Sequence, residues 1–365
     1  MEGVQSFKDD EQGLTAVIEF LSAFTLFLMI LTAFLSLAQL QMGSNDPSLD
    51  RLDRSAILGI DRLTASEGWF VPVVNGVSDY ANATSDWHLV PMDDLDNGRL
   101  QAGLILGNKL DLQRISALSN ITEEAFAAGL GLGEKMSVHL TIRVEQSDVE
   151  SRIGQLIFDG GTLRTTATAS STAFRTFYQD GEQIRVILEV HANAQVSTKM
   201  TLTEVMTRPS SSGPEWIEIY NPNQFAVSLR GWSLNHTSGI SSTNYLFQGG
   251  VVPGNATTLF SGDPSTQVVG NATAVIDLGS VGFLGVGQVN AISDGSGTLR
   301  LRYTQLDEST PGEIDAVTWG GNTGLIVNLG QSIERQDSSR FSQSSWAIQE
   351  NQHQVNMFKA NKSTL

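Results

Sequence analysis

An apolar stretch over residues 14–40 constrains this chain more than any other feature of its sequence. Its single formal charge is Glu19, and residues 20–40 carry none. A helix rises about 1.5 Å per residue, so roughly 20 apolar residues span the ~30 Å hydrocarbon core of a bilayer. Lipid offers the backbone no hydrogen-bond partners, whereas a helix satisfies its own. The pattern predicts a transmembrane helix over residues 14–43 that meets membrane lipid through residues 14–40. The alternative is a buried core helix, although such helices rarely run this long without a polar face.

The remaining composition limits the classes of function. The chain has 365 residues, a formal net charge of −17 and no cysteine. Its length beyond the apolar stretch suffices for two cores of ordinary size. The acidity opposes binding to phosphate backbones, so nucleic acid is not an expected partner. The lack of cysteine excludes disulfides, thiolate metal sites and cysteine nucleophiles.

Two signals disagree about which side of the membrane the polar part occupies. Lys8 precedes the apolar stretch while Arg51 and Arg54 follow it, which weakly favours a cytoplasmic C-terminal part. N-x-S/T sequons, which accept glycans only on the exoplasmic side, all follow the stretch. With the Ser/Thr-rich, lysine-poor composition, they favour a single-pass cell-membrane protein whose C-terminal domains are extracellular. The candidate glycosylation sites are Asn82, Asn120, Asn235, Asn255, Asn271 and Asn361.

A polar leader, residues 1–13, ends in Gly13, after which the apolar run begins at Leu14. This arrangement resembles the class III leader of type IV pilins and of pilin-like archaeal surface proteins. The resemblance implies cleavage after Gly13, with Glu19 pairing a neighbouring subunit's amine and so offsetting its own burial. The acidic run at residues 9–11 departs from the family, in which a basic residue usually precedes the cut. The simpler interpretation places Glu19 at the membrane interface, where the helix dipole favours an acidic first turn.

Residues 44–198 show a helical period first and a strand period later, which predicts an α+β domain. Thr122 is a good N-cap, and Asp180-Gly181 supplies a two-residue hairpin turn. A helix followed by an antiparallel sheet is also the order of a pilin head, so this region resembles a pilin-like head domain. We expect helices over residues 48–65, 111–118 and 122–129, a loop-like stretch over 69–98, and strands over 137–145 and 170–192.

The C-terminal region, residues 199–356, carries two specific blocks. The first is Glu215-Trp216-Ile217-Glu218-Ile219-Tyr220-Asn221-Pro222, and the second is Leu229-Arg230-Gly231-Trp232-Ser233-Leu234. In this order they resemble the lamin tail domain, which implies an all-β immunoglobulin-like sandwich. Short strands between turn residues support the same fold from pattern alone. We expect Trp232 in the core, a hairpin connection at 294–297, a polar tail at 357–365, and strands over 200–206, 215–220, 227–234, 257–261, 298–304 and 313–319.

The sequence contains no phosphate-binding loop, no zinc-protease helix motif and no nucleophile elbow. Glu215 and Glu218 invite an acid/base interpretation, but the lamin-tail resemblance implies that both belong to a structural strand block. His139 and His191 can meet across a sheet, yet lone strand histidines are far more often ordinary outward-facing residues than a metal pair. We therefore expect no catalytic, cofactor-binding or metal site, and no enzyme.

The leading hypothesis is a membrane-anchored cell-surface structural or interaction protein: a scaffold, an adhesin or a filament-associated subunit. Its expected partners are other copies of itself or envelope proteins. The alternative is an envelope tether that recruits a hydrolase or nuclease in trans, because prokaryotic lamin-tail domains resemble accessory modules of such enzymes. Fold alone does not decide between them.

Overall fold

The structure, a computed structural model, divides into two compact units, Met1–Arg54 and Ser55–Leu365. The predicted polar tail, Asn271 and Asn361 lie outside the residues it describes. The described residues are 5–43, 47–133, 135–192, 199–210, 213–267, 269–270, 272–286, 291–304, 311–323, 325–336 and 345–349.

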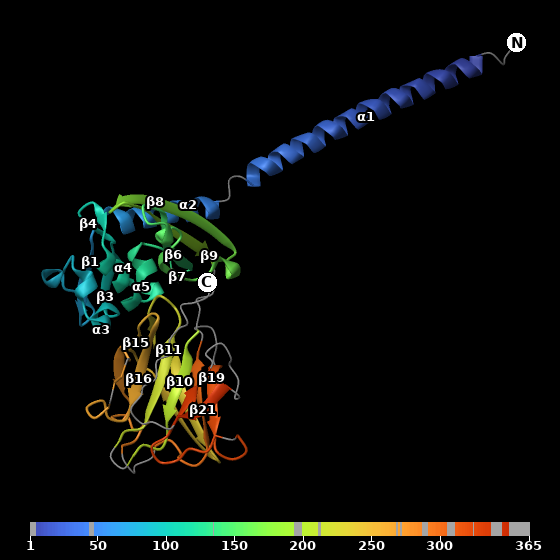
Figure 1. The fold of residues 1–365 in the computed structure, drawn as a ribbon. Helices are drawn as coiled ribbons and strands as arrows, with labels where there is room; N and C mark the ends of the chain where they lie inside the picture. The colour runs from blue at the N-terminus through green and yellow to red at the C-terminus, as the bar shows by residue number, and fades with distance from the viewer. Residues whose placement is uncertain are drawn as a thin grey trace. The chain divides into compact units, whose positions relative to one another are not determined.

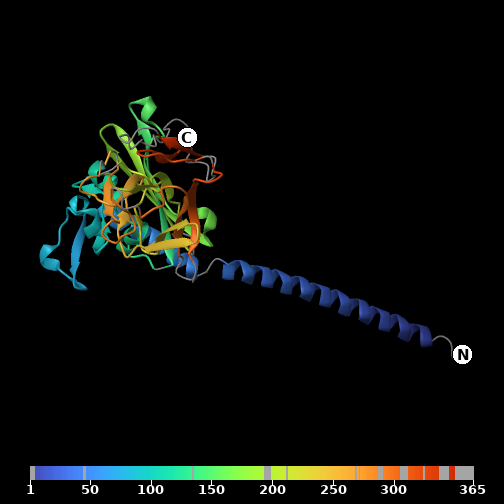
Figure 2. The same cartoon turned by 90° about the horizontal axis from the view of Figure 1, so that it is seen from below.

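The first unit is dominated by one long helix, α1 (Gln5–Gly43). Figure 2 shows it as a continuous rod, and it passes through Gly13 without a break. Among the described helices, this one is long and apolar enough to cross a membrane, over Thr15–Leu37, a test that a membrane anchor and a signal sequence both pass. The predicted apolar helix is confirmed, although helical structure begins within the polar leader rather than at Leu14.

The second unit contains an α+β head, whose main sheet has the strand order β7-β6-β9-β8. Its strands are β6 (Met136–Ser147), β7 (Leu156–Gly161), β8 (Ala169–Gln179) and β9 (Glu182–Ala192). All neighbours are antiparallel, and positive φ at Asp180 and Gly181 closes the predicted β8–β9 hairpin. The alternation along β6 and β9 buries one face of each strand and confirms both strand predictions.

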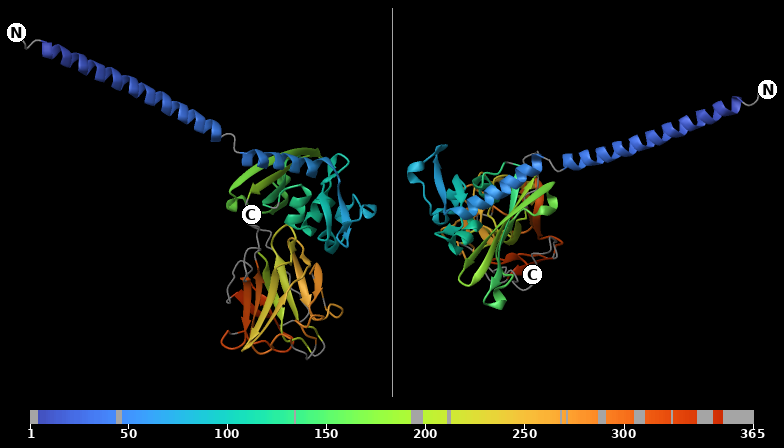
Figure 3. Two further views of the ribbon diagram at one scale, coloured as in Figure 1. Left: turned by 180° about the vertical axis from the view of Figure 1, so that it is seen from behind. Right: turned by 90° about the horizontal axis from the view of Figure 1, so that it is seen from above.

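A helix packs on the buried face of this sheet. It is α2 (Pro47–Ala65), which confirms the predicted helical period. Ile60 and Leu63 are buried, and a Cβ at Gly59 would stand 2.8 Å from Leu188 Cδ2, so a larger residue there would require the Leu188 side chain to shift. Figure 3 shows α2 lying across the strands of the head sheet.

The loop-like interpretation of residues 69–98 is wrong at the start of this stretch, whereas residues 79–97 form turns and short helices. This stretch contains β1 (Gly68–Val74) and β2 (Val77–Ser78), which join β3 (Gly98–Ala102) in a three-stranded sheet of order β2-β1-β3. Trp87, buried in this part of the head, donates from Nε1 to the Glu67 and Gly103 carbonyls. Of the prolines and tryptophans that suggested turns, Trp69 and Pro72 lie within β1, and Pro91 precedes a short helix, α3 (Met92–Leu95).

The other head elements are short. The predicted helices over 111–118 and 122–129 are confirmed as α4 and α5, with Asp111 and Thr122 as capping side chains. The set comprises α3 (Met92–Leu95), α4 (Leu112–Ala117), α5 (Glu123–Gly129), β4 (Ile105–Leu106), β5 (Lys109–Leu110) and the 3₁₀ turns Tyr80–Asn82, Trp87–Leu89, Leu118–Asn120, Glu150–Arg152 and Arg164–Thr166.

The C-terminal region is a β-sandwich (Figure 1). One sheet has the order β17-β16-β11-β10-β20-β21, and the other has the order β14-β13-β18-β19. The first comprises β10 (Thr201–Met206), β11 (Trp216–Asn221), β16 (Ala256–Ser261), β17 (Ala274–Asp277), β20 (Ser332–Arg335) and β21 (Trp346–Gln349). The second comprises β13 (Trp232–Ser238), β14 (Ser241–Leu246), β18 (Gly297–Tyr303) and β19 (Gly312–Trp319); β12 (Val227–Ser228) pairs with β15 (Val251–Val252).

One hydrophobic core fills the space between these sheets. Trp232, 1% exposed, lies in it with its ring centroid 5.0 Å from that of Tyr303, which confirms its predicted place. The hairpin predicted at residues 294–297 is wrong, because this loop leads into β18, whose partners are β13 and β19 rather than the preceding β17. The strands predicted over 200–206, 215–220, 257–261, 298–304 and 313–319 are present, and β14, β15, β17, β20 and β21 are additional. The strand predicted over 227–234 is split into β12 and β13, which belong to different sheets.

Candidate functional site

Glu215, the first residue of the lamin-tail-like block, is a fully buried structural carboxylate. Its oxygens accept hydrogen bonds from the backbone N–H groups of Gly285 at 2.6 Å, Ala291 at 3.2 Å and Ile292 at 3.1 Å. Burial raises the pKa of Glu215 to about 7, while these donors work in the opposite direction. The Glu215 carboxylate thus holds loop residues that lie far from it in sequence, at Gly285 and at Ala291 and Ile292. The sequence alone did not reveal this role.

Asn221, at the end of the same block, organises a loop. Its Nδ2 donates to the carbonyls of Phe225, Val252 and Pro253 at 3.0–3.1 Å, and its Oδ1 accepts from the backbone N–H of Asn223. Pro222 is exposed beside it and turns the chain. This fully buried amide therefore holds residues 222–226 in one conformation.

The loop presents Phe225 to the head. Its ring, 2% exposed, lies 5.0 Å from the Phe126 ring of α5 and 5.3 Å from the Phe158 ring of β7, measured between centroids. Such aromatic pairs add to the free energy of burying apolar surface. Phe225 thus plugs a junction between the head and the sandwich.

Backbone hydrogen bonds reinforce this head–sandwich junction. The Ala226 N–H donates to the Ile121 carbonyl at 3.0 Å, and the Gly254 N–H donates to the Ser119 carbonyl at 2.7 Å. Thr122, the N-cap of α5, forms a parallel bridge with Ala226. Sequence reasoning missed Phe225, Phe126 and Phe158, because no local pattern tells which buried aromatic belongs to a domain core and which to a junction.

The sandwich also carries a row of three acidic residues, the glutamate row: Glu218, Glu204 and Glu334. They lie opposite one another on β11, β10 and β20. Glu218 Oε1 accepts from Thr203 Oγ1 at 2.5 Å, and Glu204 Oε1 accepts from Ser332 Oγ. Burial raises the pKa of Glu204 to about 8 and that of Glu218 to about 7.

The glutamate row does not have the form of an active site. The described residues show no group of three or more His, Cys, Asp or Glu side chains arranged to hold a metal ion. Glu204 and Glu218 are each 2% exposed, which leaves a substrate no access. Glu204 and Glu334 were missed from the sequence, because only the strand register brings them beside Glu218.

The other residues of the two motif blocks have structural places. Trp216 packs with Met206 and Leu259 in a small separate cluster. The Tyr220 hydroxyl donates to Asn255 Oδ1 at 2.8 Å. Gly231 adopts φ +82°, a conformation that L side chains rarely take, so it fits the turn before Trp232.

The sequons differ in the access they offer. Asn82 and Asn255 are exposed, and Asn120 is half-buried in the 3₁₀ turn at the head–sandwich junction. Asn235 is buried in β13, and its Nδ2 donates to Ser242 Oγ and the Thr243 carbonyl. Glycosylation therefore stays a prediction, for which Asn82 and Asn255 offer the accessible amides.

His191 departs from its predicted outward-facing place. Its side chain is fully buried, Nδ1 lies 3.0 Å from Ser170 Oγ, and burial lowers its pKa. His139 lies on the neighbouring strand with Nε2 3.0 Å from Asp159 Oδ1. His191 is thus buried although the alternation of β9 places it on the face opposite Val190.

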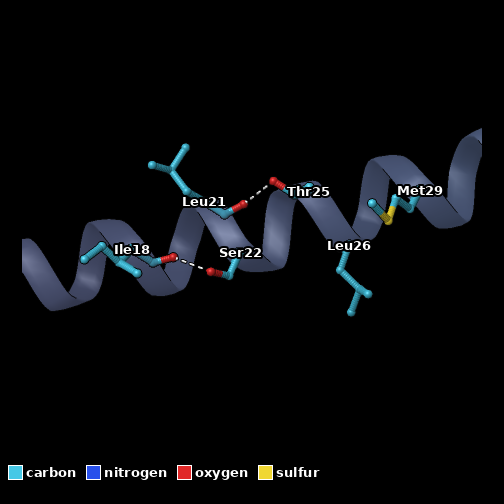
Figure 4. Close-up of a pocket in the computed structure, with 6 residues that line it drawn as sticks. All are labelled: Ile18, Leu21, Ser22, Thr25, Leu26 and Met29. Atoms are coloured by element: carbon cyan, nitrogen blue, oxygen red, sulfur yellow. Dashed lines mark hydrogen bonds between the residues drawn. The ribbon is translucent and has the colours of Figure 1, made fainter.

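The surface of α1 has the opposite character. Described apolar side chains along Val17–Leu37 are exposed, and a shallow groove runs past Ile18, Leu21, Leu26 and Met29 (Figure 4). Ser22 and Thr25 lie in that groove and donate to the carbonyls four residues earlier, at 2.8 and 2.7 Å. These bonds satisfy both hydroxyls without water, so they suit an apolar surrounding. Glu19 is exposed on the same helix.

Comparisons with known proteins bear on the sandwich alone. No curated protein matches the chain. The pilin-like interpretation of the leader and the head stays a prediction. The family model of the Lamin Tail Domain matches residues 193–321, the part of the chain that includes both motif blocks, the Asn221 loop and strands β10 to β19.

Proposed function

We propose that this chain is a membrane-anchored cell-surface structural or interaction protein that presents a lamin-tail-like sandwich. It acts as a scaffold, an adhesin or a filament-associated subunit, with other copies of itself or envelope proteins as partners. In this proposal α1 is the membrane anchor, the head follows α1 in the chain, and the sandwich that follows the head is the domain presented to partners.

The observation that carries the proposal is the unpartnered apolar surface of α1. Fully exposing these side chains to water would cost about 25 cal/mol per Å² of apolar area, and no described residue of the chain covers them. A lipid bilayer removes this cost, and the described length of apolar helix matches its thickness.

The head and its junction support the display role. A helix packed on a four-stranded antiparallel sheet is the arrangement expected of a pilin-like head. The Phe225 plug and the backbone bonds beside it hold the sandwich on that head. Interfaces that transmit position or force need such fixed junctions, because flexible linkers let domains move independently.

Protease added to intact cells tests the location. We expect it to remove most of the chain beyond residue 43, since the proposal places those residues outside. Complete protection until lysis would overturn the extracellular placement. Co-purification of a hydrolase or nuclease with the solubilised chain, in place of polymers of the chain, would favour the envelope tether instead.

Phe225→Ala tests the junction. Removing the ring leaves a cavity between Phe126 and Phe158, so limited proteolysis should release separately folded head and sandwich fragments. Phe174→Ala is the matched control, because that ring is 54% exposed on the edge strand β8. Equal resistance of the Phe225 variant and the wild type would show that the ring does not hold the two domains together.

A further inference from the structure

We propose that two copies of this chain pair edge to edge through β14, as antiparallel strands related by a two-fold axis. β14 ends the four-stranded sheet of the sandwich, and it pairs with β13 over six consecutive positions without a register shift. No described strand pairs with its other side. An edge of this kind presents a row of free backbone N–H and C=O groups that can bind another strand.

The sequence of β14 lacks the usual protections against such pairing. It reads Ser-Ser-Thr-Asn-Tyr-Leu, with no charge, proline or glycine. Residues 241–244 are exposed, and Ile240, at the tip of the β13–β14 hairpin, is 106% exposed. Edge strands that must stay single carry charges, prolines or bulges.

The other sheet edges do carry protections. β19 holds Glu313 at the point where its pairing with β18 shifts register. β7 shows a register shift against β6 and carries Asp159, while β8 carries Arg175. β21 and β17 have four residues each. Among the described edge strands of five or more residues in the four-stranded, six-stranded and three-stranded sheets, β14 alone carries no charge, so two copies can meet along it without placing like charges together.

Symmetry limits the register of the proposed pair. Opposed side chains of an antiparallel pair share one face of the sheet, and successive residues alternate between faces. A two-fold pair must therefore place one residue opposite itself, and at the middle of β14 that residue is Thr243 or Asn244. Only Ser, Thr, Asn, Tyr and Leu side chains meet in either register.

The expected affinity is low in dilute solution. Two six-residue edges bury less surface than the roughly 1,200 Å² of a stable interface. The anchoring proposed above confines copies to one membrane and raises their effective concentration. The proposed pairing depends on the proposed function in one respect, namely that anchoring in one membrane raises the effective concentration of the copies.

Single cysteines test the pairing, because the chain has no cysteine of its own. Opposed Cα atoms of an antiparallel pair lie about 4.5–5.5 Å apart, within the range of a disulfide. The variants are Thr243→Cys and Asn244→Cys in the full chain, oxidised mildly in native membranes and run on a non-reducing gel. We expect one of the two to form a disulfide dimer.

Two controls separate pairing from collision. Thr172→Cys places a thiol at an exposed position of the charged edge strand β8 and should stay monomeric. A lysine beside the new thiol should reduce the dimer, because the two-fold axis brings both added lysines to the same face of the paired strands: Asn244→Lys is added to the Thr243→Cys variant, and Thr243→Lys is added to the Asn244→Cys variant. The proposal is overturned if neither β14 variant forms a dimer, which is also the result expected when a strand of another protein occupies this edge. It is equally overturned if the Thr172→Cys control forms as much dimer as the β14 variants.

The same samples keep the two proposals apart. Membrane fractionation reports the anchoring directly. If the chain is not in the membrane fraction, the proposed function fails, and the purified chain at high concentration must still form the β14 disulfide for the pairing to stand.

Discussion

The α1 helix and the sandwich differ in which side chains they expose and which they bury. Along α1 the described apolar side chains are exposed, whereas the sandwich buries Glu204, Glu215 and Glu218 beside a core of three tryptophans. The sandwich supplies partners for the Glu218 and Glu215 carboxylates from its own hydroxyls and loops. α1 satisfies its hydroxyls internally but leaves its apolar surface to be covered from outside.

This difference indicates that the two regions depend on their surroundings unequally. A domain that contains its own hydrogen-bond partners keeps its fold in water. A helix with an apolar surface on every side needs lipid or other helices.

Deleting residues 1–43 removes the region that depends on its surroundings. We expect the remaining chain to move completely from the membrane fraction to the soluble fraction and to keep its β-rich circular dichroism spectrum. As a control, deleting residues 1–4 should leave the chain in the membrane fraction. A truncated chain that stays membrane-bound, or that aggregates without folding, would contradict the contrast.

Trp232→Ala tests the stability of the sandwich. The indole is 1% exposed, so its removal should lower the free energy of unfolding by about 3–5 kcal/mol through lost burial and a cavity. Denaturant unfolding of the chain lacking residues 1–43 measures this. Leu329→Ala, at a position 63% exposed, is the control and should change stability by no more than about 0.5 kcal/mol.

The buried carboxyls make the sandwich sensitive to pH. Burial raises the pKa of Glu204 from 4.5 to about 8, so the folded chain binds a proton that the unfolded chain has lost. The stabilisation is complete below pH 4.5 and is lost as the pH rises through about 8. We expect the free energy of unfolding to fall across that interval.

Glu204→Gln tests this dependence, because an amide resembles the protonated acid. A pKa displaced by one pH unit corresponds to about 1.4 kcal/mol. The fall in the free energy of unfolding with rising pH should therefore be smaller in the variant than in the wild type, by on the order of 2–4 kcal/mol. Unfolding titrations at several pH values measure it, and Glu313→Gln on the exposed edge strand is the control. A decline as steep in the Glu204 variant as in the wild type would show that this carboxyl does not titrate with folding.

Much of the fold was predictable because its signals are local. The alternation along β9, the Asp180-Gly181 turn and the Thr122 cap each depend on a few adjacent residues, and each was confirmed. The lamin-tail blocks likewise placed Trp232 in the core. The β1–β3 sheet was missed because its strands are short and lie among prolines and turn residues.

The candidate sites were less predictable, because they are built by register and tertiary contact. Glu218 stands out in sequence only as part of a motif, and it becomes one of three neighbouring carboxyls through the β11–β10–β20 pairing. Phe225 reads as a core residue and is instead a plug against the head. Distances of this kind cannot be read from spacing along the chain.

Glu19, the formal charge within the apolar stretch, should affect assembly far more than stability. If the leader is cut after Gly13, the mature chain begins with the amine of Leu14. That amine lies about 7–8 Å along the helix axis from Glu19, given a rise of about 1.5 Å per residue. The separation is long for pairing within one chain, but it suits neighbours staggered along a filament. Glu19→Gln should then leave membrane insertion intact and impair assembly, because a neutral amide cannot compensate the amine.

N-terminal sequencing of the chain from native membranes decides the processing directly. A chain that starts at Leu14 supports the cut, and Gly13→Val should block it and retain the leader. A chain that still starts at Met1 or Glu2 refutes pilin-type processing and leaves a plain anchor with an interfacial Glu19. In that case Glu19→Gln and Gly13→Val are both nearly silent. The continuous helix through Gly13 fits either result, because cleavage on the cytoplasmic side would shorten α1 without changing the apolar surface that follows it.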